Sequence, residues 1–277
     1  MPELPEVETI RSDLQQLVVG EKILELECLF AGSITCDSIT AFRKDLLGQE
    51  IKKVERRGKY LLLHLSNKQI LVIHLRMTGQ LIVKQKINRS NDQDIRFTRL
   101  IFHLSHHKQI LFNDIRKFGR IFLSRDSDLG TRFSNLGLEP LSPEFTFTAF
   151  DKLLGQNTRK IKAFLLDQSK IAGLGNIYVD ETLFASKIHP ETPVKEISQA
   201  KRQALHRNIQ KILQEAIKKR GTSSRNYVDS FARTGNYQNF LKVYGKKGQP
   251  CVNCGSKIKR TVVAQRGTHY CPKCQKK

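Results

Sequence analysis

The sequence predicts an α+β protein in three parts: a leading helix with an antiparallel β-region, a helical region, and a small metal-binding unit with a β-hairpin. Three observations support this prediction. Apolar residues recur at helical spacing near the start, and short strand-like runs separated by turn residues follow them. Two pairs of cysteines stand close to the C-terminus, beyond a stretch with helical periodicity.

The composition indicates a nucleic-acid partner. The chain has 277 residues, enough for two compact domains, and 39% of them are hydrophobic. Its net charge is +22, and residues 201–277 hold 19 Lys and Arg against two acidic residues. The first 200 residues are closer to balance, with 29 basic and 24 acidic residues. A basic C-terminal part suits a polyanion, although a solubilising surface or a ribosome-type protein would also carry such charge.

Other features point to the cytosol. No window approaches eighteen consecutive apolar residues, so no membrane span is expected. The acidic start lacks the hydrophobic region of a secretion signal. Six cysteines in that compartment are more often thiols or metal ligands than disulfides. Two of them, Cys28 and Cys36, lie in the β-region without metal-type neighbours and are expected to be structural.

The first element expected is a helix over residues 3–19, which Gly20 would end. Its apolar face consists of Leu4, Val7, Ile10 and Leu14. From residue 21 to about residue 125, runs such as YLLLHLS and RLIFHLS predict the strands of an antiparallel sandwich or barrel. The polar segment 86–96 is expected to be an exposed loop.

Beyond residue 137 the pattern becomes helical. Helices are expected over residues 158–168, 176–187 and 201–220. Gly221 lies just past the last of these, where a glycine commonly follows a helix end. The polar, turn-rich segment 221–238 has a length that is usually functional or mobile. A separate small unit is expected to begin near residue 243.

The strongest local signal is a pair of Cys-x2-Cys motifs with sixteen residues between them. The terminal segment is too short to bury much core, so a bound metal would supply folding energy that it lacks. The alternating stretch between the pairs predicts a β-hairpin with its turn at residues 265–267. Chance cysteines or a redox pair are the alternative. The expected ligands of one structural zinc ion are Cys251, Cys254, Cys271 and Cys274.

Two positions in the C-terminal half of the chain could bind phosphate. Arg266 is expected at the tip of the hairpin, where it could reach a phosphate or enter a groove, or remain solvated. In QSKIAGLGNIYVDE, Asn176 is expected to be the N-cap of a helix whose first amides could hold a phosphate. A tight turn between packed helices is the structural alternative.

The segment NDIRKFGR combines a turn signal with a cation and an aromatic ring. Asn113 and Asp114 are expected to form a turn, and Arg116 and Phe118 to share one face of an extended segment. A cation beside an exposed ring could fill a gap in a stack of bases, although most such pairs only pack.

His74 and Lys59 are weaker candidates. His74, in the motif HLRM, is more often a satisfied strand histidine than a reagent. Lys59 follows Gly58 at the mouth of a strand. Such a lysine is usually solvated, but it could meet a phosphate or act on a sugar.

The start of the chain, MPELPEVE, has two interpretations. Proline suits the first turn of a helix, and glutamates there complement the helix dipole. Alternatively, removal of Met1 would leave Pro2 with a secondary amine that can attack an electrophilic sugar carbon. Glu3 could then shuttle protons, and Glu6, one helical turn further on, could position it.

The motifs MPELPEVET, RRGKYLL, HLRM, NDIRKFG, AGLGNIYVDE and RGTHYCPKCQ follow one another along the chain. In this combination the sequence resembles bacterial formamidopyrimidine-DNA glycosylases over essentially its full length. The resemblance implies a bifunctional enzyme of base excision repair. It would excise oxidised purines, such as 8-oxoguanine and formamidopyrimidines, from duplex DNA through a Schiff base with the terminal proline. It would then cleave the strand by β- and δ-elimination, as a monomer in the cytoplasm, associated with a bacterial nucleoid.

The same resemblance implies the domain organisation. A leading helix and β-sandwich would form the catalytic domain over residues 1–135. A helix–two-turn–helix domain over residues 136–240 would bind DNA, and a four-cysteine zinc finger would occupy residues 241–277. DNA would lie in a basic cleft between the domains. The stretch 221–237 would be a mobile loop that covers the everted base.

Roles carried over from the family fall on matching residues. Pro2 resembles the nucleophile and Glu3 the general acid and base. Glu6 resembles a supporting carboxylate in the catalytic site. Lys59 resembles a phosphate-contacting lysine that aids elimination. Arg266 is expected both to take part in catalysis and to bind DNA.

The other implied roles concern DNA. Met77, Arg116 and Phe118 would fill the gap left by the everted nucleotide, and Arg116 would pair with the orphaned cytosine. The remaining contacts with the DNA backbone fall to Asn176, Arg266 and His74.

Thr78 departs from the pattern, because some family members have glutamate directly after HLRM; the ranking of damaged bases is therefore open. One alternative is a relative of endonuclease VIII, which prefers oxidised pyrimidines and typically begins PEGPE rather than PELPE. Another is a non-catalytic zinc-ribbon protein that binds nucleic acid. A degenerate member that only recognises abasic DNA is disfavoured, because every matched catalytic position is filled.

Overall fold

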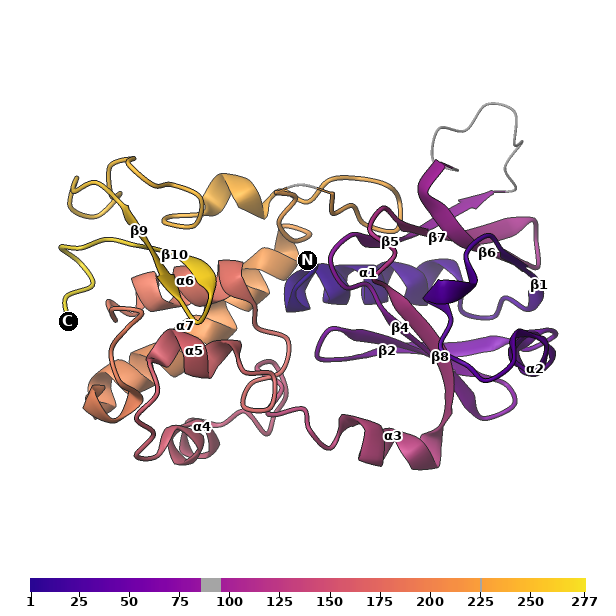
Figure 1. The fold of residues 1–277 in the computed structure, drawn as a ribbon, viewed down its shortest axis with the longest axis horizontal. Coiled ribbons are helices and arrows are strands. Elements are labelled where there is room, and N and C mark those ends of the chain that lie inside the picture. Colours follow the sequence, from indigo (N-terminus) through magenta and orange to yellow (C-terminus); the bar gives the residue numbers. More distant parts are fainter. Residues whose placement is uncertain (86–95, 225) are drawn as a thin grey trace. The chain divides into compact units, whose positions relative to one another are not determined.

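The structure is a computed structural model that describes residues 1–85, 96–224 and 226–277. Within these residues the chain forms two compact units (Figure 1). The first consists of Met1–Ser134 and Lys219–Asn236, and the second of Asn135–Lys218 and Tyr237–Lys277. Of the loop predicted at residues 86–96, all but Arg96 lies outside the described residues.

Two four-stranded antiparallel sheets form most of the first unit. They have the strand orders β1-β6-β7-β5 and β2-β3-β4-β8, and share no strand among the described residues. The sequence predicted a sandwich or a barrel, and two separate sheets make this unit a sandwich. The first sheet contains β1 (Ile23–Cys28), β5 (Gly79–Gln85), β6 (Thr98–Leu104) and β7 (Lys108–Asp114). The second contains β2 (Ile51–Arg57), β3 (Tyr60–Leu65), β4 (Gln69–His74) and β8 (Arg120–Arg125).

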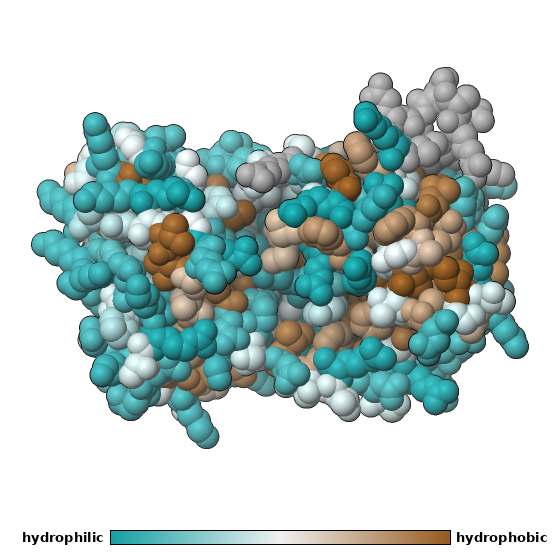
Figure 2. All heavy atoms as spheres, in the orientation of Figure 1, coloured by the Kyte–Doolittle hydropathy of each residue, from teal (hydrophilic) through white to brown (hydrophobic). Residues whose placement is uncertain are grey.

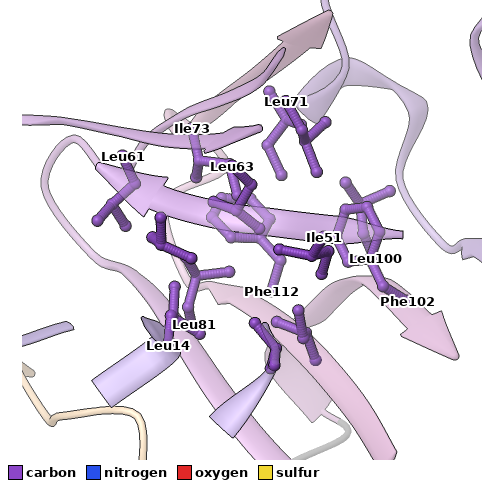
Figure 3. Packing of buried hydrophobic residues seen from close by; sticks show 14 of the residues in the cluster. Leu14, Ile51, Leu61, Leu63, Leu71, Ile73, Leu81, Leu100, Phe102 and Phe112 are labelled. Atoms are coloured by element: carbon purple, nitrogen blue, oxygen red, sulfur yellow. The ribbon is translucent and has the colours of Figure 1, made fainter. Parts of the chain in front are cut away.

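The leading helix α1 (Leu4–Leu17) belongs to the core of this sandwich. It contacts β2 and β3 of one sheet and β5 of the other. Its apolar face meets the inner faces of both sheets in one cluster, in which Leu14 lies with Leu63 and Phe112 (Figure 3). A fourteen-residue helix is marginal in water, and each fully buried Leu or Ile contributes about 1.5–3 kcal/mol. Packing therefore fixes the start of the chain.

Two short helices of the first unit were not expected from the sequence. They are α2 (Ile39–Leu46) and α3 (Asp126–Phe133). Helix α2 buries only Phe42 and Leu46, and α3 has no buried residue. Each helix has only eight residues, which is shorter than the stretch over which helical periodicity can be recognised in a sequence.

The second unit is helical with a terminal hairpin, as predicted. Its helices are α4 (Phe147–Leu154), α5 (Ile161–Leu166), α6 (Asn176–Ala185) and α7 (Gln199–Lys218), with 3-10 turns at Val194–Glu196 and Tyr237–Phe240. Helix α6 is buried continuously from Ile177 to Phe184, and α5 and α7 pack against it. It is thus the central helix of this unit.

Three local predictions were wrong. The N-cap of α6 is Gly175, and Asn176 is the first helical residue. The hairpin of β9 (Lys259–Val263) and β10 (Arg266–Tyr270) turns at residues 264–265, both with positive φ, so Arg266 begins a strand. Asn113 and Asp114 end β7, and the turn follows them. In each case the boundary was misplaced by one or two residues, because local sequence signals locate the ends of an element less precisely than the element itself.

Hydrophilic residues cover most of the face shown in Figure 2, in both units. Within the described part of the chain, no helix is both long enough and apolar enough to span a membrane.

Candidate functional site

The start of α1 is buried and held by reciprocal hydrogen bonds. Glu3 is its N-cap, and its side chain accepts the backbone N–H of Glu6. The Glu6 carboxylate in return accepts the N–H of Glu3 at 2.7 Å. Glu3 is only 4% exposed and Glu6 2%, and Pro2 is buried as well. Glutamates that merely complement a helix dipole normally remain in water, so this burial points to a more specific role.

Glu6 also holds a segment more than two hundred residues away. Its Oε1 accepts the backbone N–H of Thr222 at 2.7 Å. Gly221 has φ +78, and a Cβ on it would lie 2.8 Å from Glu6 Oε1. Only glycine suits this position on both counts. The segment Lys219–Asn236 is thereby attached to the carboxylate next to Glu3.

An arginine that pairs with two aspartates also holds this segment against α1. Arg220 Nη2 lies 2.6 Å from an Asp13 oxygen on α1 and 2.5 Å from an Asp229 oxygen. Asp13 also accepts the N–H of Ser230 at 3.2 Å. The segment therefore meets α1 near its start, at Arg220, and again at Ser230. This cluster was not predicted from the sequence, because Asp13 lies far along the chain from Arg220 and Asp229 and the three residues follow no motif.

His74 lies at the end of β4, paired with Tyr60 of β3, with the two rings 4.5 Å apart. Its Nδ1 accepts the N–H of Arg76 at 3.0 Å. Burial, then the cations of Arg76 and Lys59, lowers the pKa of His74 to about 3. His74 is thus a neutral, hydrogen-bonded histidine close to the buried Lys59.

Two adjoining turns at one end of the sandwich carry large exposed side chains. Met77, between β4 and β5, is 39% exposed, and Phe118, between β7 and β8, is 46% exposed. The guanidinium of Arg116 lies 4.6 Å from the centre of the Phe118 ring. The predicted contact between Arg116 and Phe118 is present, but on a turn and not on an extended segment. Exposed apolar groups beside a stacked cation suit insertion between bases.

The second unit brings Asn176 and the Arg266 strand together. Asn176 Nδ2 donates to the carbonyl oxygen of Gly267 at 2.9 Å. Arg266, the neighbour of Gly267, is exposed. The two residues that resemble phosphate grips thus lie at a helix start and on an adjoining strand of one unit, where phosphate binding is common.

A buried ion pair fixes that arrangement. Lys162 Nζ, fully buried, lies 2.6 Å from Asp180 Oδ1 and 3.2 Å from the Gly267 oxygen. Asp180 accepts the N–H of His269 at 2.8 Å through its other oxygen. Removing either partner would leave an unpaired buried charge. This pair was not predicted from the sequence; its signal was Lys162 within the apolar stretch IKAFLL, and Asp180, next to Glu181, within NIYVDETLF.

The four cysteines predicted to bind zinc lie together. Their sulfur atoms are all within 4.8 Å of one another, with Cys254 and Cys271 3.4 Å apart and Cys251 and Cys274 3.9 Å apart. Four thiolates at about 2.3 Å from a tetrahedral zinc ion require similar separations. Burial, and then the neighbouring thiols, raises the pKa of Cys274 to about 12, a penalty that a bound cation would remove. The residues fit one structural zinc ion.

Three family models match the chain in order. They are described as Formamidopyrimidine-DNA glycosylase N-terminal domain over residues 1–121, Formamidopyrimidine-DNA glycosylase H2TH domain over residues 136–228, and zinc finger found in FPG and IleRS over residues 248–277. Together with the sandwich, the helical unit and the cysteine cluster, they define a zinc-finger DNA glycosylase. The chain belongs to the formamidopyrimidine-DNA glycosylase family.

Individual relatives agree along their whole length. The formamidopyrimidine-DNA glycosylase of Pelotomaculum thermopropionicum is 44% identical, with 100% of this chain and 99% of the relative covered. That of Lactiplantibacillus plantarum is 43% identical, with 98% of each covered. Lactococcus lactis Fpg in complex with abasic-site DNA has a TM-score of 0.91 at 38% identity, over 99% of this chain and 100% of that one. MutM in complex with DNA containing carbocyclic 8-oxo-G has a TM-score of 0.91 at 39% identity, with both chains fully covered.

We expect His74 to make stability depend on pH. Between its ordinary pKa of 6.5 and about 3, the unfolded chain binds a proton that the folded chain does not. The contribution of His74 to the free energy of unfolding is therefore complete above pH 6.5. It decreases as the pH is lowered, by up to about 1.4 kcal/mol per pH unit. His74→Asn, whose Oδ1 can still accept the Arg76 N–H, should show a shallower decline in urea unfolding between pH 6.5 and 4.5. Equal slopes for the two proteins would contradict this account.

We expect Cys254→Ser to lose zinc, because three thiolates no longer close a tetrahedral site. Elemental analysis should find close to one zinc per chain in the unaltered protein and much less in the variant. Affinity for duplex DNA should fall with it, since the hairpin that carries Arg266 depends on the metal. Cys36→Ser, at an exposed cysteine outside the cluster, is the matched control and should keep its zinc. Full zinc content in Cys254→Ser would exclude this ligand.

Proposed function

We propose that this protein is a bifunctional DNA glycosylase and AP lyase of base excision repair that excises oxidised purines and then cleaves the abasic strand. Membership of the formamidopyrimidine-DNA glycosylase family supports the glycosylase activity. The observation that carries the mechanism is the buried, doubly anchored start of α1, where Pro2, Glu3 and Glu6 lie together. Damaged duplex DNA is the substrate and one zinc ion is the structural cofactor.

Catalysis begins, in this proposal, with Pro2 as the terminal residue after removal of Met1. Its secondary amine attacks the sugar C1′, the damaged base leaves, and an iminium links protein and DNA. Glu3 gives and takes protons during ring opening, and Glu6 fixes Glu3 through its backbone N–H. A carboxylate screened from water makes such transfers more effective. Lys59, buried close to His74, contacts a phosphate and assists elimination.

Recognition requires the base to leave the stack. Met77, Arg116 and Phe118 are proposed to occupy the vacated space, with Arg116 pairing with the opposite cytosine; their exposure on adjoining turns supports this. Asn176 and Arg266 are proposed to grip phosphates. Arg266 also takes part in the elimination steps, and His74 contacts the DNA backbone.

We retain the division into a catalytic part (1–135), a DNA-binding helical part (136–240) and a zinc finger (241–277) as a proposal. The segment Lys219–Asn236 belongs by sequence to the second part, but it packs on α1. Residues 221–236 of the predicted loop over the everted base (221–237) belong to this segment, and its packing on α1 supports that assignment. The proposed setting is the bacterial cytoplasm, at the nucleoid, where the DNA lies.

Oxidised pyrimidines are a second candidate substrate class. Wild-type Lactococcus lactis Fpg has been solved in complex with DNA that contains an oxidised pyrimidine. That structure has a TM-score of 0.91 and 37% identity to this chain, and both chains are covered completely. Single-turnover excision from duplexes that carry either 8-oxoguanine or an oxidised pyrimidine decides between the classes. Faster excision of the pyrimidine would reverse the proposed preference.

We expect borohydride to trap the protein covalently on a duplex with one 8-oxoguanine opposite cytosine, because it reduces the iminium. Peptide mapping should place the adduct on Pro2, and Pro2→Gly should lose excision while binding abasic duplex. A protein with an extra residue before Pro2 is the control, since its proline nitrogen is an amide and should not be trapped. Tight binding without an adduct, with Met1 shown to be absent, would favour a non-catalytic binding protein.

We expect Glu3→Gln to slow base excision by about 100-fold, the scale of general acid–base catalysis, and to affect cleavage of a preformed abasic site less. Glutamine retains an oxygen for the Glu6 N–H, so the helix start should persist. Glu8→Gln, in the same helix but only partly buried and paired with Arg11 and Arg56, is the matched control. Equal losses of excision and strand cleavage would refute the role assigned to Glu3.

A further inference from the structure

The turn that carries Met77 and the turn that carries Arg116 are joined by one hydroxyl. Thr78 Oγ1 donates to Asp114 Oδ1 at 2.5 Å and accepts the backbone N–H of Arg116 at 3.0 Å. Thr78 directly follows Met77 and precedes β5, whereas Asp114 ends β7. The hydroxyl therefore connects the two places from which side chains project toward DNA in the proposed function.

Asp114 is the fixed end of this connection. Its side chain is fully buried, and its carboxylate also accepts the N–H of Arg116 at 3.2 Å and that of Gly119 at 2.7 Å. Its own carbonyl oxygen accepts Arg99 Nε at 2.8 Å. A buried carboxylate with several donors is rigid, because each lost bond would leave charge without a partner.

The turn after Asp114 has little freedom of its own. Lys117 has φ +60, a conformation that residues other than glycine rarely adopt. At Gly119, a Cβ would lie 2.4 Å from Phe112 Cζ, so the backbone approaches the core closely. Directly before Lys117, the N–H of Arg116 is held by Thr78 and Asp114 together. A change at Thr78 is therefore passed to the backbone of Arg116.

We propose that Thr78 is a positioning residue that, by joining the Met77 turn to Asp114 and Arg116, sets the placement of the Arg116 guanidinium and thus the preference for the base opposite the lesion. This inference rests on the proposed function, in which Arg116 faces the orphaned base. The Thr78 hydroxyl has both its roles, donor and acceptor, filled within the protein. Because it donates its proton to Asp114 and accepts the Arg116 N–H, we infer that it acts through Arg116.

The test is the ratio of single-turnover excision rates for 8-oxoguanine opposite cytosine and opposite adenine. Thr78→Val keeps the shape of the side chain and removes both hydrogen bonds, so the ratio should fall about fivefold, the scale of one hydrogen bond. Thr78→Ser restores the hydroxyl and should restore the ratio. Thr40→Val, at an exposed threonine of α2, is the matched control and should leave it unchanged.

An unchanged ratio in Thr78→Val would overturn the proposal, even if the melting temperature fell, because a purely structural role lowers stability without changing selectivity. A ratio that falls equally in Thr78→Ser would also overturn it. If Thr78→Val does not fold, Thr78→Ala replaces it. Binding to duplexes with a tetrahydrofuran abasic analogue opposite cytosine or adenine provides a second ratio that needs no chemistry. Absence of excision by the unaltered protein would count against the proposed function, while this binding ratio would still test Thr78.

Discussion

The carboxylate of Glu6 is the interaction on which the candidate catalytic site depends. It accepts the N–H of Glu3 at the start of α1 and the N–H of Thr222 from the far end of the chain. Two charge-assisted bonds to one buried carboxylate fix both groups relative to each other. The position of the proposed loop is therefore tied to the residue proposed to move protons. Gly221 makes this possible, because any side chain there would displace the carboxylate.

In the second unit a buried cation has the role that the buried carboxylate of Glu6 has in the first. The buried ammonium of Lys162 binds Asp180 and the carbonyl of Gly267, so α5, α6 and the hairpin share one centre. A buried pair of this kind gives little net stability, but removing either partner would leave an uncompensated charge in the core. The start of α6 and strand β10 can act together on one ligand only if the distance and orientation between them are constant. Gripping successive phosphates of DNA would require such constancy.

Much of the architecture followed from local patterns. The spacing of the cysteines predicted the metal cluster, and the helical period around Leu4 and Leu14 predicted α1, because both signals lie within short stretches of chain. The short helices α2 and α3 were not predicted, since eight residues are too few for helical periodicity to be recognised. The turn of the hairpin and the N-cap of α6 were misplaced by one or two residues. Propensity identifies an element more reliably than its ends.

The sequence by itself determined the family, the zinc ligands and the identity of the candidate reagents, because these are carried by motifs of fixed local spacing. It did not show which groups hold those reagents. Asp13 with Arg220, Lys162 with Asp180, and Thr78 with Asp114 became visible only in the folded chain. Their charges and hydroxyls are ordinary in the sequence and acquire meaning through burial and partners far along the chain. Such pairings are decided by packing, which brings distant residues together and removes the water that would otherwise screen them.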